Sequence, residues 1–156
     1  MNMGAVHTQV KLTNEVDEEL VKRGLLAPHH LRSCEVDALV DTGATALVLP
    51  AKIVEQLGLR IRGQQIARYA DEREEMIGVT GGVIVECKGR QTLEEAMVVG
   101  DTVLLGQVIL EKLDLWVDCK HQKLIPNPAH PDYPVAYIRR MADFEWYAEY
   151  LSTGLC

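Results

Sequence analysis

Apolar residues alternate with polar ones along much of the chain, with the period of two that half-buried β-strands show. The stretches 7–12 and 31–40 both alternate, and the second becomes continuously apolar towards its end. A continuous apolar run predicts a strand that enters the core. A polar turn over 41–43 interrupts this run, and a second short buried strand is expected over 46–49.

Short helices and hairpins are predicted next. A helix is expected to begin at Pro50 and to end before Gly58, and a second is expected over 107–113. Residues 59–99 predict strands joined by tight turns, with a hairpin whose polar centre lies within 68–73. The polar and acidic stretch 14–19, by contrast, predicts a loop or the start of a short turn.

The C-terminal part of the chain changes character. Strands are predicted over 114–118 and 122–125, and three of the six prolines then fall within 127–134, which predicts a linker. Apolar residues recur every three or four positions over 135–151, which predicts an amphipathic helix that covers its own domain or a partner. The expected organisation is a domain over 1–126, a Pro-rich linker over 127–134 and a helical extension over 135–156.

Composition indicates a single soluble domain with an aliphatic core. The 156 residues are 47% hydrophobic but 5% aromatic, and this length excludes an enzyme with two full catalytic lobes. The net charge of −7 disfavours nucleic-acid binding, because an acidic protein repels phosphates. The four cysteines lack a Cys-x-x-Cys spacing, and the chain shows neither a signal peptide nor a membrane span. We therefore expect a reduced, cytoplasmic protein.

The motif with distinctive chemistry is Asp41-Thr42-Gly43, set between the two apolar strands. A carboxylate there is costly to bury unless hydrogen bonds or a proton compensate for its charge. The Gly43 N–H can approach the carboxylate, and the Thr42 hydroxyl can hold neighbouring backbone. The plainer alternative is a surface turn in which the Asp bonds its own backbone. The apolar flanks favour a functional carboxylate.

These residues resemble the retropepsin-like aspartic proteases, the retroviral-type class that also has bacterial members. Residues 39–44 match the family's apolar-apolar-Asp-Thr-Gly-Ala loop, and 104–106 match its second signature of two apolar residues and a Gly before a short helix. Residues 68–73 lie where the family has its flap hairpin, and Leu-Asp-Leu at 113–115 is similar to bacterial members. The resemblance implies an all-β fold, a closed barrel with short helices, to which the C-terminal helix is added.

The resemblance also implies a mechanism based on two carboxylates. One ionised carboxylate takes a proton from a water that attacks the peptide carbonyl, while its protonated neighbour donates to the carbonyl oxygen. No metal or organic cofactor is needed, and the five histidines lack the spacing of metal ligands. Asp-Thr-Gly occurs once, and no other Asp is followed by Thr-Gly or Ser-Gly. The second carboxylate is expected from Asp41 of a second copy, which predicts a homodimeric endopeptidase.

The predicted site has a catalytic part and a substrate-binding part. Asp41, Thr42 and Gly43 form the catalytic part, with Asp41 as the acid and base. An extended peptide is expected to pair with the flap by strand addition, although glycines at 78–82 offer an alternative flap tip. The predicted substrate-binding residues are Ala44, Tyr69, Ala70, Asp71 and Glu72.

Departures from the retroviral pattern leave a second hypothesis open. Retroviral members usually carry acidic residues after the Ala of the catalytic loop and Arg after the second Gly. This chain has Thr45, Ala46 and Gln107 at those places, so the charged pairing that braces the retroviral dimer is absent. The alternative is a weakly active or inactive module of the same fold that dimerises or binds peptides.

Overall fold

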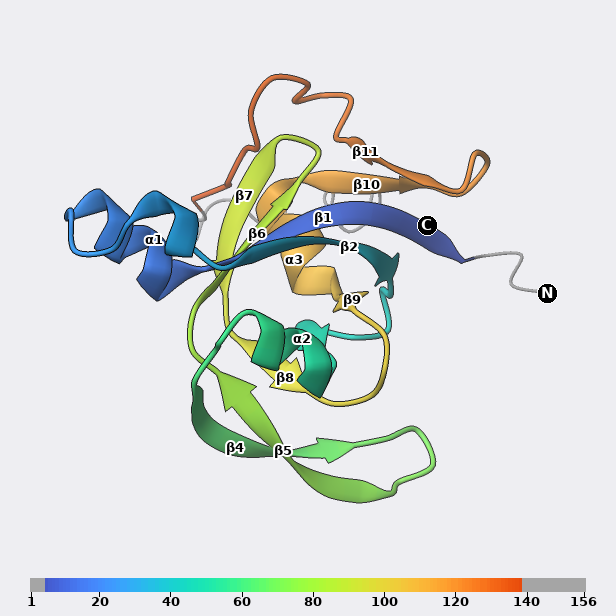
Figure 1. The fold of residues 1–156 in the computed structure, drawn as a ribbon. Coiled ribbons are helices and arrows are strands. Elements are labelled where there is room, and N and C mark those ends of the chain that lie inside the picture. Colours follow the sequence, from blue (N-terminus) through green and yellow to red (C-terminus); the bar gives the residue numbers. More distant parts are fainter. Residues whose placement is uncertain (1–4, 139–156) are drawn as a thin grey trace.

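The protein is described by a computed structural model that covers residues 5–138 (Figure 1). Strands dominate this part of the chain, with short helices between them. The strands are β1 (Val6–Asn14), β2 (Ser33–Val40), β3 (Leu47–Leu49), β4 (Ile61–Arg68), β5 (Glu74–Thr80), β6 (Val83–Cys87), β7 (Arg90–Glu94), β8 (Ala96–Val98), β9 (Leu104–Leu105), β10 (Leu115–Asp118) and β11 (Lys123–Pro126). The helices are α1 (Glu15–Lys22), the 3-10 turn η1 (Pro28–His30), α2 (Ala51–Gln56) and α3 (Gln107–Leu113).

One large open sheet organises the domain. Its strand order is β4-β5-β8-β3-β9-β2-β1-β6-β7, and β10 and β11 form a separate hairpin. Within residues 5–138, β4 and β7 are the two edge strands and do not pair with each other, so the sheet is not closed. The prediction of a mainly β fold is confirmed, whereas the prediction of a closed barrel is wrong. Alternation reports which residues face the core, but it does not report whether the two edges of a sheet meet.

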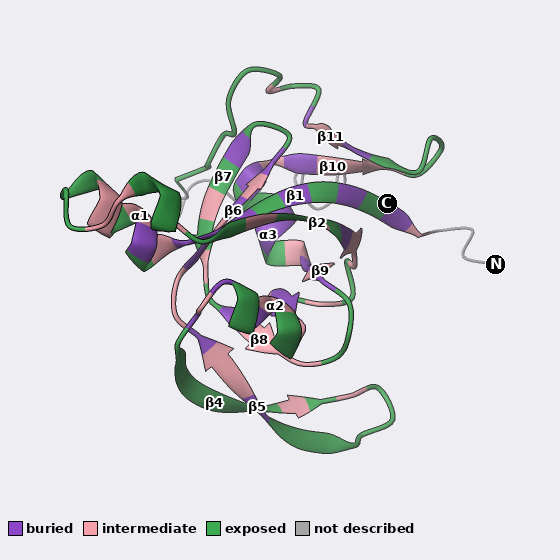
Figure 2. Cartoon of the chain, viewed as in Figure 1, coloured by how far each residue is buried: buried purple, intermediate pink, exposed green. Residues whose placement is uncertain are grey.

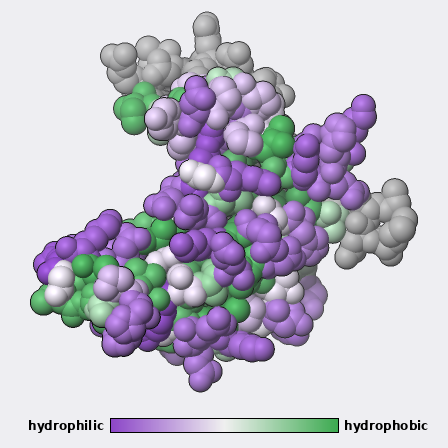
Figure 3. Space-filling view, turned by 45° about the horizontal axis from the view of Figure 1, so that its top comes forward, coloured by the Kyte–Doolittle hydropathy of each residue, from purple (hydrophilic) through white to green (hydrophobic). Residues whose placement is uncertain are grey.

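The core lies under β1 and β2 and is completed by α2 and α3. Strand β1 buries every second residue from Val6 to Leu12, and its antiparallel register places Val10 opposite Val36. Leu57, the C-cap residue of α2, and Leu110 of α3 are both fully buried in this core. Each aliphatic side chain of this size contributes about 1.5–3 kcal/mol when buried. The face shown in Figure 3 is mostly hydrophilic, with smaller hydrophobic areas between the polar side chains.

The acidic stretch after β1 forms helix α1 and not the predicted loop. The Asn14 side chain caps this helix, because it accepts a hydrogen bond from the Asp17 N–H at 3.1 Å and donates to the Leu57 carbonyl at 2.9 Å. Acidic residues in the first turn are favoured there by the helix dipole. Asp17 is buried and binds the Arg32 guanidinium at 2.8 and 3.0 Å.

The end of the described chain runs over the domain without regular structure. Residues 127–138 contain no helix or strand, so the amphipathic helix predicted from 135 is not present over 135–138. The remainder of that predicted helix lies outside the described residues. Within residues 5–138, no helix is long and apolar enough to cross a membrane.

Candidate active site

Asp41 lies in the turn that follows the buried end of β2. Its N–H donates to the Leu105 carbonyl at 3.0 Å, which fixes its backbone to β9. Its Oδ1 accepts the Gly43 N–H at 2.9 Å, and its carbonyl accepts the Ala44 N–H at 3.1 Å. The contact between Gly43 and the carboxylate is the one predicted. A plain surface turn would also form this local bond. The contacts that the rest of the domain makes with the turn therefore distinguish a functional carboxylate from a plain surface turn.

Strand β9 lies between the two strands that flank this turn. It runs parallel to β2, with Leu39 opposite Leu104, and antiparallel to β3, with Leu47 opposite Leu105. The two signature motifs, far apart in sequence, are therefore hydrogen-bonded neighbours. The turn that carries Asp41 is anchored on both sides by the same strand.

The first turn of α3 completes the support of the Asp41 turn. The N–H groups of residues 106, 107 and 108 donate to the carbonyls of residues 46, 44 and 45, at 3.1, 2.8 and 3.2 Å. A Cβ at Gly106 would lie 2.5 Å from the Ala46 carbonyl oxygen, so only glycine allows this approach. The sequence motif signalled Gly106, but its partner could not be read from the sequence.

The support of the Asp41 turn comes from backbone bonds within one chain, and the side chains that depart from the retroviral pattern take no part in these bonds. The Gln107 side chain donates a hydrogen bond to the Glu111 carboxylate at 3.2 Å. This bond lies within α3 and does not involve the Asp41 turn. Hydrogen bonds of the backbone do not depend on side-chain identity. The departures at Thr45, Ala46 and Gln107 therefore leave the turn supported.

The tip of the Asp41 turn is accessible. Asp41 is half-buried, and Thr42 and Gly43 are exposed. The support assigned to the Thr42 hydroxyl stays a prediction. Ala44 is half-buried, and its N–H and carbonyl are both bonded within the domain, so its predicted contact with a peptide would use other atoms.

The β4–β5 hairpin has its tip at residues 69–73. The Tyr69 N–H donates to the Arg73 carbonyl at 2.8 Å, and the Glu72 N–H donates to the Tyr69 carbonyl at 2.9 Å. Glu72 has a positive φ of 68°, a conformation that favours glycine. The alternative at 78–82 is not a hairpin tip between β4 and β5, because Gly78 lies within β5 and 81–82 join β5 to β6.

Side chains of the hairpin hold this tip together. The Tyr69 hydroxyl donates to Glu75, and this hydrogen bond raises the pKa of Tyr69. The Arg73 guanidinium lies 4.5 Å from the centre of the Tyr69 ring, and the Asp71 carboxylate accepts the Arg73 N–H at 3.0 Å. Most of the hairpin is exposed, as Figure 2 shows for β4.

The Asp41 turn and the hairpin tip are separate features. In Figure 1 the segment after β2 and the tip both lie on the side of the molecule away from α1. Within residues 5–138, no hydrogen bond or ion pair joins the two. In the same part of the chain, no three His, Cys, Asp or Glu side chains gather closely enough to hold a metal ion.

Comparison with protein families identifies the class as retropepsin-like aspartic protease. The model of a family described as "gag-polyprotein putative aspartyl protease" matches residues 30–112, more than half of the chain. The match includes the Asp41 turn and the first turn of α3. The chain belongs to this family of gag-polyprotein aspartyl proteases.

Solved structures include a distant likeness. The solution structure of simian foamy virus (mac) protease is 16% identical, with a TM-score of 0.42, over 67% of this chain and 90% of that chain. No curated protein matches the sequence.

Proposed function

We propose that the protein is an aspartic endopeptidase whose active unit is a dimer. The observation that carries the proposal is the Asp41 turn, which is held by backbone bonds from β9 and α3 while its tip stays accessible. Membership of the aspartyl protease family supports the same activity. The sequence holds one Asp-Thr-Gly motif, so each chain supplies half of a two-carboxylate site, and Asp41 of a second copy supplies the other half.

The turn presents one oxygen of Asp41 for chemistry. Oδ1 accepts the Gly43 N–H, which leaves Oδ2 to face the second carboxylate, a water or the substrate. Two carboxylates brought together share a proton, since both do not ionise easily at short distance. The ionised member takes a proton from water as the water attacks the peptide carbonyl, and the protonated member donates to the carbonyl oxygen. The carboxyl that took the water proton then donates it to the peptide nitrogen as the C–N bond breaks, while the other carboxylate takes a proton from a hydroxyl of the tetrahedral adduct. An acid and an amine leave, and no covalent bond to the enzyme forms.

The β4–β5 hairpin is proposed to cover an extended peptide bound at this site. Its exposed tip, with Tyr69, Ala70, Asp71 and Glu72, offers backbone and side-chain groups to such a peptide. Leu-Asp-Leu at 113–115, which is similar to bacterial members, favours a bacterial-type member of the family. Because each chain carries a charge of −7, the dimer interface should be mostly apolar or internally paired.

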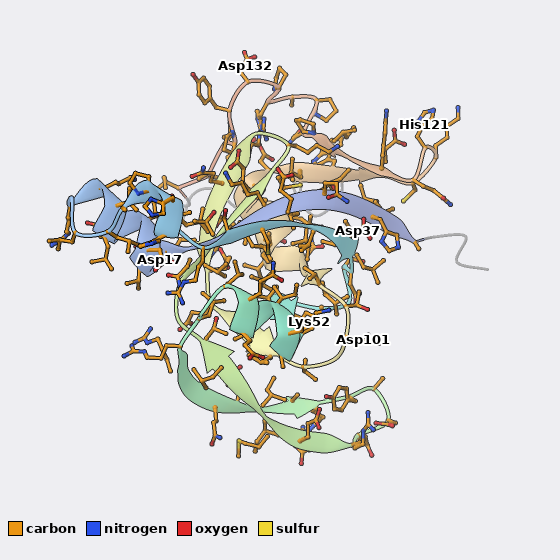
Figure 4. The ribbon with its side chains drawn as sticks, in the orientation of Figure 1. Asp17, Asp37, Lys52, Asp101, His121 and Asp132 are labelled. Carbon is orange, nitrogen blue, oxygen red and sulfur yellow. The ribbon has the colours of Figure 1, made fainter. Side chains whose placement is uncertain are left out.

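The first prediction tests Asp41 itself. Asp41→Asn should lower peptide cleavage between about pH 4 and 7 on the order of 10³-fold or more, because a proton-transfer group is lost. Its thermal unfolding should stay close to that of the wild type, since the Asn oxygen still accepts the Gly43 N–H. Asp101→Asn is the matched control, because Asp101 is exposed on another loop (Figure 4) and accepts a hydrogen bond from the Thr102 hydroxyl. It should keep full activity.

Two outcomes would contradict the proposal. Equal cleavage by the wild type and Asp41→Asn would exclude a catalytic role for this carboxylate. A wild type that is dimeric by sedimentation but cleaves no peptide would favour the dimerisation or peptide-binding module.

A further inference from the structure

The C-terminal end of α3 is anchored by one carboxylate, that of Asp114. This residue closes the helix in a left-handed conformation, with φ 54° and ψ 50°. Its carboxylate accepts hydrogen bonds from the Asn127 amide at 3.0 Å, from His130 Nδ1 at 2.6 Å and from the Val135 N–H at 3.1 Å. Its side chain is 13% exposed and that of His130 is 18% exposed. We call residues 127–135, which Asp114 holds, the C-terminal strap.

A buried arginine reinforces the same junction from the sheet. Arg90, on β7, is 6% exposed. Its guanidinium donates to the carbonyls of Leu113 and Asp114 at 3.0 and 2.8 Å, and also to the carbonyl of His130. The last carbonyls of a helix lack partners within it, so Arg90 satisfies them and ties the end of α3 to both the strap and β7.

Helix α3 thereby joins the strap to the Asp41 turn. It is 7 residues long, and Ile109, Leu110 and Leu113 bury it in the core. Its first turn binds the carbonyls of 44–46, and its C-cap residue Asp114 binds the strap. A short buried helix moves as a unit, because packed interiors transmit displacement. The family match ends at residue 112, so Asp114 and the strap lie just beyond it.

The charge state of Asp114 suits this role. Burial raises the pKa of its carboxyl, but the hydrogen bonds from Asn127, the Val135 N–H and His130 outweigh burial and hold the pKa below its usual range. The carboxylate is therefore ionised across the pH range in which the proposed reaction is measured.

We propose that Asp114 is a positioning residue for Asp41, acting through α3 by anchoring the C-terminal strap. The inference rests on the proposed function for its activity measurements. The rival interpretation is a local role, in which Asp114 attaches the strap and has no influence on the start of α3. The two interpretations differ in what happens at residues 106–108 when the anchor is removed.

The experiment compares the full-length wild type with Asp114→Ala, His130→Asn and Asp118→Ala. Asp118→Ala is the matched control, because Asp118 also pairs with a histidine, His121, at 2.8 Å, but on the β10–β11 hairpin, away from α3 (Figure 4). His130→Asn keeps a nitrogen donor in reach of Asp114 and serves as the conservative variant. The readouts are hydrogen exchange of the 107 and 108 amides, and kcat and KM for peptide cleavage.

Asp114→Ala should speed exchange of the 107 and 108 amides by about tenfold or more, because their bonds to the Asp41 turn open more often. Its kcat should fall by about 10–100-fold with KM changed by less than about twofold, since a misplaced catalytic group slows the reaction more than binding. His130→Asn should retain most of the wild-type behaviour, and Asp118→Ala all of it.

Faster exchange confined to the strap, with kcat unchanged, would overturn the proposal. If Asp114→Ala also speeds amide exchange throughout β1, the variant has loosened the whole domain, and a milder variant, His130→Ala, takes its place. Faster exchange in His130→Ala that is selective for the 107 and 108 amides supports the proposal. Uniformly faster exchange, or no change in exchange, overturns it. A wild type without cleavage refutes the proposed function alone, because the exchange data still test whether Asp114 positions the Asp41 turn.

Discussion

The Asp41 turn and the tip of the β4–β5 hairpin are both polar turns between strands, yet they are held in different ways. The Asp41 turn is fixed by backbone bonds from β9 and α3, elements distant in sequence. The hairpin tip is held by bonds among its own residues 68–75 and stands in solvent. Local openings are easiest where contacts are few and backbone is exposed. The contrast fits an immobile acid–base group and a cover that moves to admit substrate.

Two glycines provide the sharpest test of this contrast. Gly106→Ala would set a Cβ 2.5 Å from the Ala46 carbonyl oxygen, whereas a Cβ at Gly63 in β4 meets nothing within 4 Å. We expect Gly106→Ala to lower the free energy of unfolding by about 2–5 kcal/mol, because backbone must shift. Gly63→Ala should change it by less than about 1 kcal/mol. Urea unfolding measures both, and a mild effect of Gly106→Ala would mean that the turn tolerates displacement.

The loss of stability at low pH should depend on an ion pair outside the β4–β5 hairpin, that of the buried Asp17 with Arg32. Hydrogen bonds from Arg32 lower the pKa of Asp17 despite its burial. The folded state therefore binds this proton less readily than the unfolded chain, so the pair stabilises the fold above the unfolded pKa of about 3.9. This contribution is lost as the pH falls through the lower folded pKa.

Asp17→Asn should cost about 1–3 kcal/mol at neutral pH, because the Arg32 bonds are weakened in a buried place. It should also flatten the loss of stability between about pH 5 and 2. The exposed pair of Arg68 and Glu74 in the hairpin is the matched control. Glu74→Gln should alter stability by less than about 0.5 kcal/mol. Equal effects of the two variants on the free energy of unfolding, measured by urea titration, would contradict the claim that the pair of the buried Asp17 contributes more to stability than the exposed pair of the hairpin.

The smallest effect is expected at the hairpin tip. Glu75→Gln removes the charged acceptor of the Tyr69 hydroxyl, so the pKa of Tyr69 should fall towards its ordinary value. An ultraviolet titration, with Tyr69→Phe to identify the signal, measures this change. The melting temperature should not change, while the rate of hydrogen exchange at the Glu72 amide should rise. A lower melting temperature would show that the tip contributes to the global fold.

Much of the local structure could be predicted from the sequence. The strand before Asp41, helix α3 and the hairpin tip near 70–72 follow from alternation, helical spacing and polar turns within short windows. The stretch 14–19 is an exception, because its polar and acidic residues predict a loop or the start of a short turn. The structure shows that Asn14 and those acids are a capped helix start.

The remaining features depend on contacts between distant segments. Whether the sheet is open or closed depends on whether the edge strands β4 and β7 pair with each other. Alternation within a strand does not predict that pairing. The support of the Asp41 turn comes from Gly106 and α3, and the anchor of α3 comes from Arg90 and Asp114. In the sequence, Arg90 and Asp114 have the character of ordinary surface residues, and only the fold buries them.

A mixing experiment tests the central claim, that two copies of Asp41 form one site. Wild-type and Asp41→Asn chains are combined in equal amounts, exchanged to equilibrium and assayed for peptide cleavage at fixed total protein. If a site needs Asp41 from both chains, random pairing leaves about one quarter of the wild-type activity. About one half would remain if each chain carried a complete site, and that result would contradict the shared active site.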